Sequence, residues 1–226
     1  MFIPPSSLQA YRSTSEMGKA DWVILALKST ALQHAPSLIQ PLLHRNTRVL
    51  AIMNGLIDED LVDLLRNIPG ADKGTEKTLP CAAVYGGMAF ICSNRLKPGL
   101  VEHSYYGMLA GGVAASSTDR NDEEPLNALV DLWKRTKVTF TEEPSLIRGR
   151  WVKNCWNLPF NSVSCAMGGI LTVYDIVRDP GLRKLADDIM DETIQIANAD
   201  LASRGMDSSM FLGENEVNKS LLFEND

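Results

Sequence analysis

Two apolar runs decide the fold, DWVILAL at residues 21–27 and TRVLAIM at residues 47–53. Both runs are short and rich in strand-forming residues, which is typical of strands buried on both faces of a parallel sheet. Between them, residues 31–44 repeat apolar side chains at helical spacing, and Pro36 and Pro41 are expected to kink that helix. Strand, helix and strand in this order predict a βαβ crossover, the unit of a doubly wound sheet.

The pattern stays mixed as far as Pro144. Apolar runs around Gly86-Gly87, followed by the turn Lys97-Pro98-Gly99, predict a strand that leads into a hairpin at the sheet edge over residues 79–112. The other elements expected here are a helix, a polar loop, a second helix and a closing strand, at residues 57–67, 114–124, 126–136 and 138–141.

Beyond Pro144 the spacing of apolar residues becomes helical throughout. It predicts helices around residues 151–162, 182–203 and 208–223, the first of them loosened at Pro159. The predicted fold class is therefore α/β. A partial Rossmann-type domain with a parallel sheet occupies residues 1–143, and an all-helical domain occupies residues 144–226.

Composition narrows the range of functions. The chain has 226 residues and a formal net charge of −6, so no basic stripe is available for nucleic acid, and we predict no nucleic-acid partner. No apolar run is long enough to span a bilayer, and the first residues do not resemble a signal peptide. We therefore expect a cytoplasmic protein without a membrane partner. Its three histidines share no metal-ligand spacing, so no metal site is expected.

The segment WVKNCWNLPFNS at residues 151–162 carries the most specific chemical pattern. Lys153, Asn157 and Asn161 recur at every fourth position, and such residues drift by only about 40° per step around a helix. One ammonium and two carboxamides on a common face suit a small substrate with a carbonyl and a carboxylate. The alternative is a surface lysine with two polar helix residues.

Two further polar positions follow the predicted strands. Lys28 comes after the first strand and Asn54-Gly55 after the second, and ligands of open α/β sheets bind beyond the carboxyl ends of the strands. Lys28 is a candidate for a phosphate or ribose, and Asn54 for a substrate or nicotinamide group. Alternatively, Lys28 is a solvated lysine at a helix start and Asn54-Gly55 a turn chosen for its backbone conformation.

Taken in order, these residues resemble the ketopantoate reductase (2-dehydropantoate 2-reductase) family. The resemblance runs from about Ala20 to Gly205, and it is carried by Ala26-Leu27-Lys28, Met53-Asn54-Gly55, the Gly86-Gly87 strand, the Lys97-Pro98-Gly99 hairpin and the series Lys153, Asn157 and Asn161.

The resemblance implies a nucleotide-binding domain for NADPH joined to a helical domain for substrate binding and dimerisation. The implied reaction is the NADPH-dependent reduction of a 2-oxo acid, such as 2-dehydropantoate, to the 2-hydroxy acid. Lys153 would be the general acid, and Asn157 and Asn161 would bind substrate. Lys28 and Asn54 would contact the cofactor, and Asn54 also the substrate. A homodimer is one expected assembly.

Two departures from the family's pattern keep other hypotheses open. The sequence contains no Gly-x-Gly-x-x-Gly turn, and it ends before a further helical segment in which the family carries a serine and a glutamate. A second hypothesis is therefore a truncated, catalytically silent member that acts as a binding or scaffold protein. A third is a related β-hydroxyacid dehydrogenase, which also places lysine and asparagine on a helix.

Overall fold

The structure is a computed structural model that describes residues 8–68, 78–117, 123–214 and 217. The chain divides into two compact units, residues 1–144 and residues 145–226. Unit 1 contains a sheet with helices, and unit 2 contains helices. The predicted α/β class, with a Rossmann-type sheet domain followed by a helical region, is therefore confirmed.

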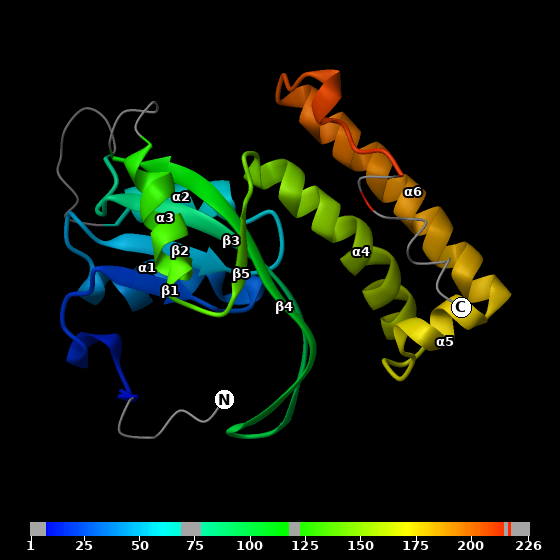
Figure 1. The fold of residues 1–226 in the computed structure, drawn as a ribbon, viewed down its shortest axis with the longest axis horizontal. Coiled ribbons are helices and arrows are strands. Elements are labelled where there is room, and N and C mark those ends of the chain that lie inside the picture. Colours follow the sequence, from blue (N-terminus) through cyan, green and yellow to red (C-terminus); the bar gives the residue numbers. More distant parts are fainter. Residues whose placement is uncertain (1–7, 69–77, 118–122, 215–216, 218–226) are drawn as a thin grey trace. The chain divides into compact units, whose positions relative to one another are not determined.

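The sheet of unit 1 has five strands in the order β1-β2-β3-β4-β5 (Figure 1). β1, β2 and the first residues of β3 are parallel, β3 and β4 form an antiparallel hairpin, and β5 is parallel to β4. The strands are β1 (Trp22–Leu25), β2 (Arg48–Ile52), β3 (Ala83–Lys97), β4 (Leu100–Ser116) and β5 (Thr139–Glu142).

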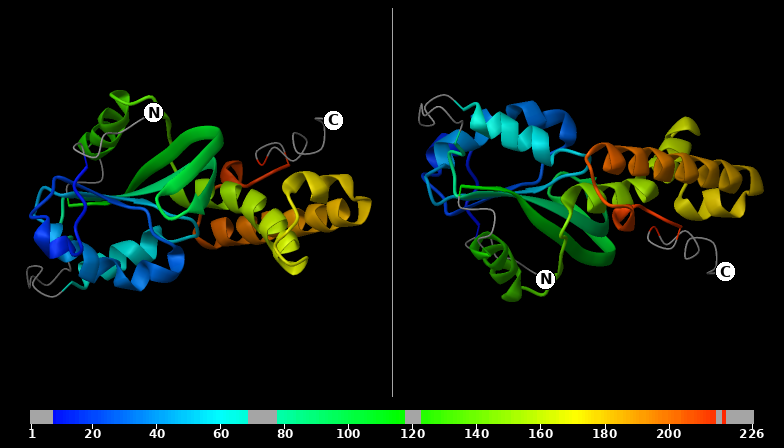
Figure 2. Two further views of the ribbon diagram at one scale, coloured as in Figure 1. Left: turned by 90° about the horizontal axis from the view of Figure 1, so that it is seen from below. Right: turned by 90° about the horizontal axis from the view of Figure 1, so that it is seen from above.

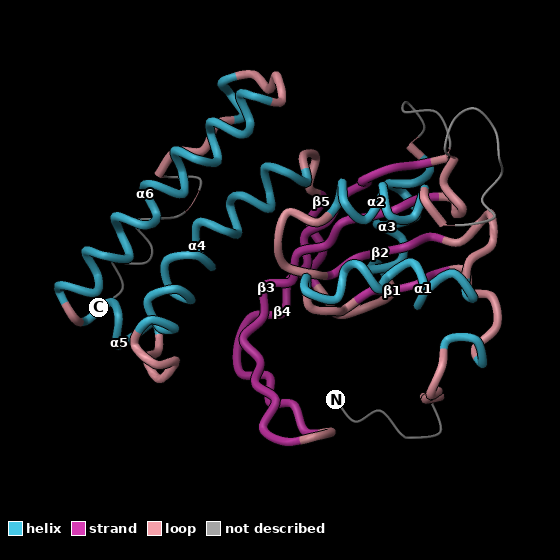
Figure 3. The backbone as a smooth tube through the Cα atoms, turned by 180° about the vertical axis from the view of Figure 1, so that it is seen from behind, coloured by secondary structure: helices cyan, strands magenta, loops and turns pink. Residues whose placement is uncertain are grey.

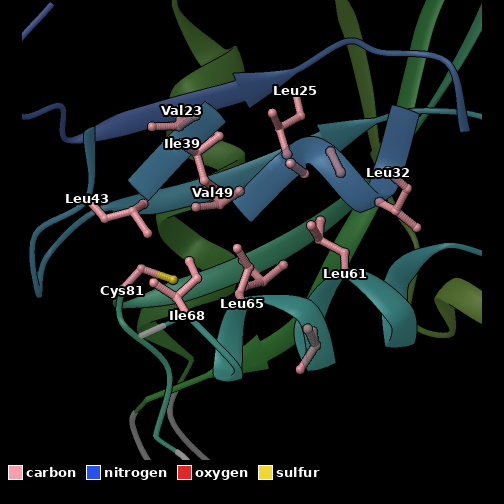
Figure 4. Close-up of a cluster of buried hydrophobic side chains, with 14 of the residues drawn as sticks. Val23, Leu25, Leu32, Ile39, Leu43, Val49, Leu61, Leu65, Ile68 and Cys81 are labelled. Atoms are coloured by element: carbon pink, nitrogen blue, oxygen red, sulfur yellow. The ribbon is translucent and has the colours of Figure 1, made fainter. Parts of the chain in front are cut away.

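Helices cover both faces of this sheet. Figure 2 shows α1 (Ala35–Ile39) and α2 (Asp58–Arg66) on one face and α3 (Glu124–Lys134) on the other. Alternating strand residues supply the two cores. Val23, Leu25 and Val49 pack with α1 and α2 (Figure 4), while the opposite core joins the strands to α3 and contains Leu50, Ala83, Tyr85 and Leu129. An ion pair between Arg48 and Glu124 also ties α3 to β2.

The segment between β1 and β2 follows the positions of its prolines. It consists of the 3-10 helix η3 (Ser29–His34), then α1, then the 3-10 helix η4 (Gln40–Leu42). Pro36 lies in the first turn of α1 and Pro41 in that of η4, positions where no intrahelical N–H is needed. The expected interruption of this helix is confirmed. A further short 3-10 helix, η2 (Thr14–Glu16), precedes β1.

Three details of the predicted sheet are wrong. The β3–β4 hairpin is not at the edge, because β5 pairs outside β4 (Figure 3). β4 continues to Ser116 because its backbone pairs with β3 as far as Ala83, so the expected loop begins later than residue 114. β1 was predicted to be buried, but its Ile24 is 49% exposed. β1 is an edge strand of the sheet, and Ile24 lies on the face opposite to Val23 and Leu25.

Unit 2 is built from α4 (Leu146–Ala166), α5 (Val173–Arg178) and α6 (Pro180–Ser203). Trp151 and Cys155 of α4 share one core with Ile176 of α5 and Met190 of α6. α4 is helical straight through Pro159, so the expected loosening does not break the helix. It ends at Ala166 and is followed by Gly168 and Gly169, whose positive φ values of 87° and 75° are readily adopted by glycine.

Two predictions for unit 2 differ from the structure. α5 was not expected, although Thr172 and Asp175 form a capping box, a signal that is visible in the sequence. The prediction of a helix at residues 208–223 is wrong for the first residues of that range, which the structure describes. Only the 3-10 helix η5 (Ser208–Met210) forms there. Residues 215–216 and 218–223 of that prediction lie outside the described residues.

Candidate active site

α4 carries Lys153, Asn157 and Asn161 on one side and apolar residues on the other. Trp151, Cys155 and Val163 are buried in the core of unit 2, whereas Lys153 and Asn157 are half-buried and Asn161 is exposed. The predicted helix face is therefore present. Asn157 and Asn161 follow Lys153 along α4 at one turn and two turns, as the spacing required.

Hydrogen bonds from tryptophans fix the rotation of α4 about its axis. Trp151 donates its Nε1–H to Asp200 Oδ2 on α6 at 2.8 Å, and Trp156 donates its own to the Val217 carbonyl at 2.8 Å. These two indole N–H groups, on neighbouring turns of α4, thus have fixed acceptors within unit 2. Lys153 lies about 160° around α4 from Trp151 and about 60° from Trp156, and it is half-buried.

Lys153 has an unusual acid–base character. Burial, the larger cause, and the positive charge of Arg150 together lower its pKa from the ordinary value of 10.5 to about 8. A lysine with a pKa of about 8 is mostly protonated at neutral pH and gives up its proton more readily than a solvated lysine. That is the property required of a general acid or base working near neutrality.

Arg150 was not among the residues selected from the sequence. It lies three residues before Lys153, and it is only 2% exposed. The helical period that joined Lys153, Asn157 and Asn161 also places Arg150 on this face, so extending the pattern backwards by one turn would have found it.

In unit 1, Lys28 and Asn54 follow neighbouring parallel strands. Both side chains are exposed, Lys28 three residues after the end of β1 and Asn54 two residues after the end of β2. Gly55 has a φ of 95°, which supports the interpretation of Asn54-Gly55 as a turn. A Cβ atom added at Gly55 would lie 3.9 Å from the Cβ of Ser29, so the two loops lie side by side.

These loops fit part of a dinucleotide cofactor. An ammonium and a carboxamide that are exposed at the carboxyl ends of adjacent parallel strands suit a phosphate or ribose and an amide, respectively. The sequence has no glycine-rich turn of the Gly-x-Gly-x-x-Gly type, which in dinucleotide-binding folds approaches the pyrophosphate. Lys28 and Asn54 therefore account for only some of the contacts that such a cofactor makes.

The thiol nearest to Lys153 in the sequence is poorly placed for chemistry. Cys155 is buried, and burial raises the pKa of its thiol to about 11, which keeps it protonated and unreactive. In the described ranges of the chain, no group of three or more His, Cys, Asp or Glu side chains is placed to hold a metal ion. None of the helices within those ranges is long and apolar enough to cross a bilayer.

Comparisons with known proteins agree with this arrangement. Residues 2–115 match the family Ketopantoate reductase PanE/ApbA, and residues 145–219 match Ketopantoate reductase PanE/ApbA C terminal. The chain belongs to the ketopantoate reductase family.

Individual relatives carry the same name. A 2-dehydropantoate 2-reductase from Nostoc sp. is 26% identical over 187 residues, which is 82% of this chain and 54% of the relative. The solved structure of 2-dehydropantoate 2-reductase from Geobacter metallireducens is 31% identical, with a TM-score of 0.72, and the match covers 93% of this chain and 62% of that one. A dimeric ketopantoate reductase from Staphylococcus aureus has the same fold, at 19% identity and a TM-score of 0.65, over 92% of this chain and 60% of that one. The chain thus spans about half the length of the curated relative and less than two thirds of each solved structure.

Proposed function

We propose that the chain catalyses the NADPH-dependent reduction of a 2-oxo acid, such as 2-dehydropantoate, to the corresponding 2-hydroxy acid. The observation that carries this proposal is the face of α4, where Lys153 has a lowered pKa and is followed by Asn157 and Asn161. Family membership and the printed name of the Nostoc relative support the same reaction.

Lys153 acts as the general acid of this reaction. Reduction of a ketone places negative charge on its oxygen, and an ammonium at that oxygen stabilises the charge and then donates its proton. The product is a hydroxyl group, and Lys153 is left as a neutral amine that recovers a proton from water. A pKa of about 8 makes both the donation and the recovery feasible near neutral pH.

Asn157 and Asn161 hold the substrate. Each carboxamide offers two N–H donors and one carbonyl acceptor, and the donors match the carboxylate and carbonyl oxygens of a small 2-oxo acid. Positioning by two side chains on consecutive turns of a rigid helix lowers the entropic cost of reaching the reactive geometry. Their contribution should therefore appear mainly in substrate binding.

Lys28 and Asn54 bind the cofactor in this proposal, and Asn54 also approaches the substrate. When bound, NADPH supplies the hydride for the carbonyl carbon. The Lys28 ammonium offers charge to a phosphate or a ribose hydroxyl, and the Asn54 carboxamide pairs with the nicotinamide amide or with the substrate. Accordingly, unit 1 serves as the nucleotide-binding domain and unit 2 as the substrate domain.

The decisive experiment follows NADPH absorbance at 340 nm while the purified chain is mixed with 2-dehydropantoate. We expect saturable consumption of NADPH, with no oxidation of 3-hydroxy acids, which a β-hydroxyacid dehydrogenase would oxidise. A parallel titration followed by nicotinamide fluorescence measures cofactor binding. Absence of both binding and turnover would reject the reductase and favour the catalytically silent scaffold.

A homodimer remains a prediction. The dimeric relative from Staphylococcus aureus supports it, and the helical unit is the expected interface. Sedimentation velocity of the purified chain gives the answer directly. A single monomeric species at micromolar concentrations would contradict both the homodimer and a scaffold role that depends on it.

A further inference from the structure

The segment that follows α6 returns along α4 and covers a second side of that helix. Residues 206–214 and Val217 of this segment are described, and Val217 is fully buried. Arg148 of α4 donates to the Met210 carbonyl at 3.0 Å, and Trp156, further along α4, donates to the Val217 carbonyl at 2.8 Å. The segment therefore runs beside α4 in the direction of that helix and is bound to it at Trp156.

Trp156 is held in one orientation. Its indole N–H is bound to the Val217 carbonyl, and the centre of its ring lies 6.2 Å from that of Phe160. Phe160 is only 6% exposed, whereas Trp156 is half-buried, so part of Trp156 remains exposed. A tryptophan with a bound N–H and a packed neighbour presents a rigid apolar surface, which a ligand contacts at little further entropic cost.

This surface adjoins the face that carries the proposed proton donor. Around α4, Trp156 lies about 60° from Lys153 on one side, and Asn157 lies about 40° from Lys153 on the other. Long side chains of a helix point back toward its amino end, so the indole covers the turn to which Lys153 belongs. Residues three apart on a helix have Cβ atoms about 5–6 Å apart, a separation that one small ligand spans. Lys153 thus lies between an apolar neighbour and a carboxamide.

A 2-oxo acid has a polar part and a side chain. Its carboxylate and carbonyl oxygens accept hydrogen bonds and suit the ammonium and the carboxamides of α4, whereas an alkyl side chain is stabilised by leaving water for an apolar surface. Trp156 offers such a surface beside Lys153. Leu158 is also apolar and is 45% exposed, but it lies about 140° around α4 from Lys153, beyond both carboxamides.

We propose that Trp156 is a specificity-determining residue for the side chain of the substrate: its indole forms the wall against which an alkyl group next to the reacting carbonyl packs. This inference rests on the proposed function of α4 and deepens it. It predicts that the chain prefers 2-oxo acids with a branched alkyl side chain to pyruvate, whose side chain is a single methyl group.

The experiment compares two substrates that differ by two methyl groups, pyruvate and 3-methyl-2-oxobutanoate, in the full chain and its variants. Trp156→Ala removes the wall. Trp156→Phe removes the N–H that binds Val217 and keeps an aromatic ring, so it separates anchoring from packing. Leu158→Ala is the matched control, because it truncates an exposed apolar side chain of the same helix at a distance from Lys153. NADPH absorbance at 340 nm gives kcat/KM for each substrate.

The measured quantity is the ratio of kcat/KM for 3-methyl-2-oxobutanoate to kcat/KM for pyruvate. We expect Trp156→Ala to lower this ratio by roughly tenfold or more, since one methylene in an apolar pocket contributes about 10–200-fold. Trp156→Phe should keep most of the ratio, and Leu158→Ala should keep all of it. A merely structural role of Trp156 would lower kcat/KM for both substrates equally. An unchanged ratio in Trp156→Ala would overturn the proposal.

A second substitution covers the case in which Trp156→Ala does not fold. Trp156→Gln keeps an N–H donor for the Val217 carbonyl and removes the apolar surface, so the ratio should fall in this variant as well. A ratio that stays at the wild-type value in Trp156→Gln would contradict the proposal in the same way.

Failure of this proposal and failure of the proposed function give different results. An active chain whose ratio does not depend on Trp156 refutes the wall and leaves the reductase in place. A chain that reduces neither substrate refutes the reductase, and NMR titration with the 2-hydroxy acids lactate and 2-hydroxy-3-methylbutanoate then tests the wall. The preference in Kd for the branched acid should fall by roughly tenfold in Trp156→Ala. Equal or undetectable binding of the two acids by the wild type would overturn the proposal.

Discussion

The α4 face of unit 2 and the strand-end loops of unit 1 carry the same kinds of group in different surroundings. On α4, Lys153 and Asn157 are half-buried above a core that contains Trp151 and Cys155, and two indole hydrogen bonds fix the helix. In the loops, Lys28 and Asn54 are exposed. Burial changes the acid–base chemistry of Lys153, and the packed core fixes the direction of its helix face.

This difference separates chemistry from binding. A proton donor must have a tuned pKa and a fixed position, and both require a packed support. Groups that only recognise a ligand can remain solvated until it arrives, at the expense of some affinity. We therefore expect substitutions on α4 to affect the reaction strongly and substitutions in the loops to affect cofactor affinity moderately.

The largest effect is expected for Lys153→Met. It removes the proton donor and keeps a side chain of similar length, so kcat should fall by about 10²–10⁴-fold, the usual contribution of general acid catalysis. KM should change much less. Stopped-flow or steady-state absorbance at 340 nm measures both constants. Lys184→Met removes an exposed lysine of α6 and should leave kcat unaltered; equal losses in the two variants would contradict the role of Lys153.

A smaller effect is expected for Asn157→Ala. Loss of one substrate hydrogen bond should raise KM by about 5–30-fold while kcat changes less, because that contact is made before and during the reaction. Ser162→Ala on the same helix is the control, since the Ser162 hydroxyl donates to the Leu158 carbonyl of its own helix. A fall in kcat with an unchanged KM would show that Asn157 acts on the transition state.

Lys28→Ala and Asn54→Ala should each weaken NADPH binding by about 3–10-fold, because solvated groups gain little from one hydrogen bond or ion pair. Nicotinamide fluorescence measures the Kd. Lys19→Ala removes an exposed lysine that precedes the amino end of β1 and is expected to leave the Kd unchanged. If Lys28→Ala, Asn54→Ala and Lys19→Ala have the same Kd for NADPH, the carboxyl ends of the strands are not the cofactor site.

The smallest effect concerns stability. The pKa of Lys153 is about 8 in the folded chain and 10.5 ordinarily, so the unfolded chain holds an additional proton between these values and folding becomes more favourable as pH rises through that window. Below pH 8 the half-buried charge opposes folding. Lys153→Met should therefore stabilise the chain by about 1 kcal/mol at pH 7, after allowance for solvent screening.

Urea unfolding followed by circular dichroism measures this difference. The advantage of Lys153→Met should be largest at pH 7 and should shrink as the pH approaches 10.5. An advantage that does not depend on pH would mean that the methionine simply packs better, and that the charge of Lys153 does not oppose folding.

Most elements that depend only on the spacing of apolar residues along the chain could be predicted from the sequence. Strands β1 and β2, the interrupted helix between them and the α4 face were all visible, because buried runs and helical spacing are local properties. The exposure of Ile24 and the place of β5 outside β4 depend on how strands pair across the sheet, which no local pattern reveals. Arg150 was missed for another reason: helical spacing places it on the α4 face, but its burial is visible only in the structure.

The pH dependence of kcat/KM for 2-dehydropantoate tests the central claim most directly, because it reports the ionisation of the essential groups in the free enzyme. Lys153 must be protonated to act as the acid, and its pKa is about 8. The account predicts that kcat/KM falls as pH rises through about 8 and that this decline is absent from the residual activity of Lys153→Met. A wild-type profile that stays flat up to pH 10 would contradict it.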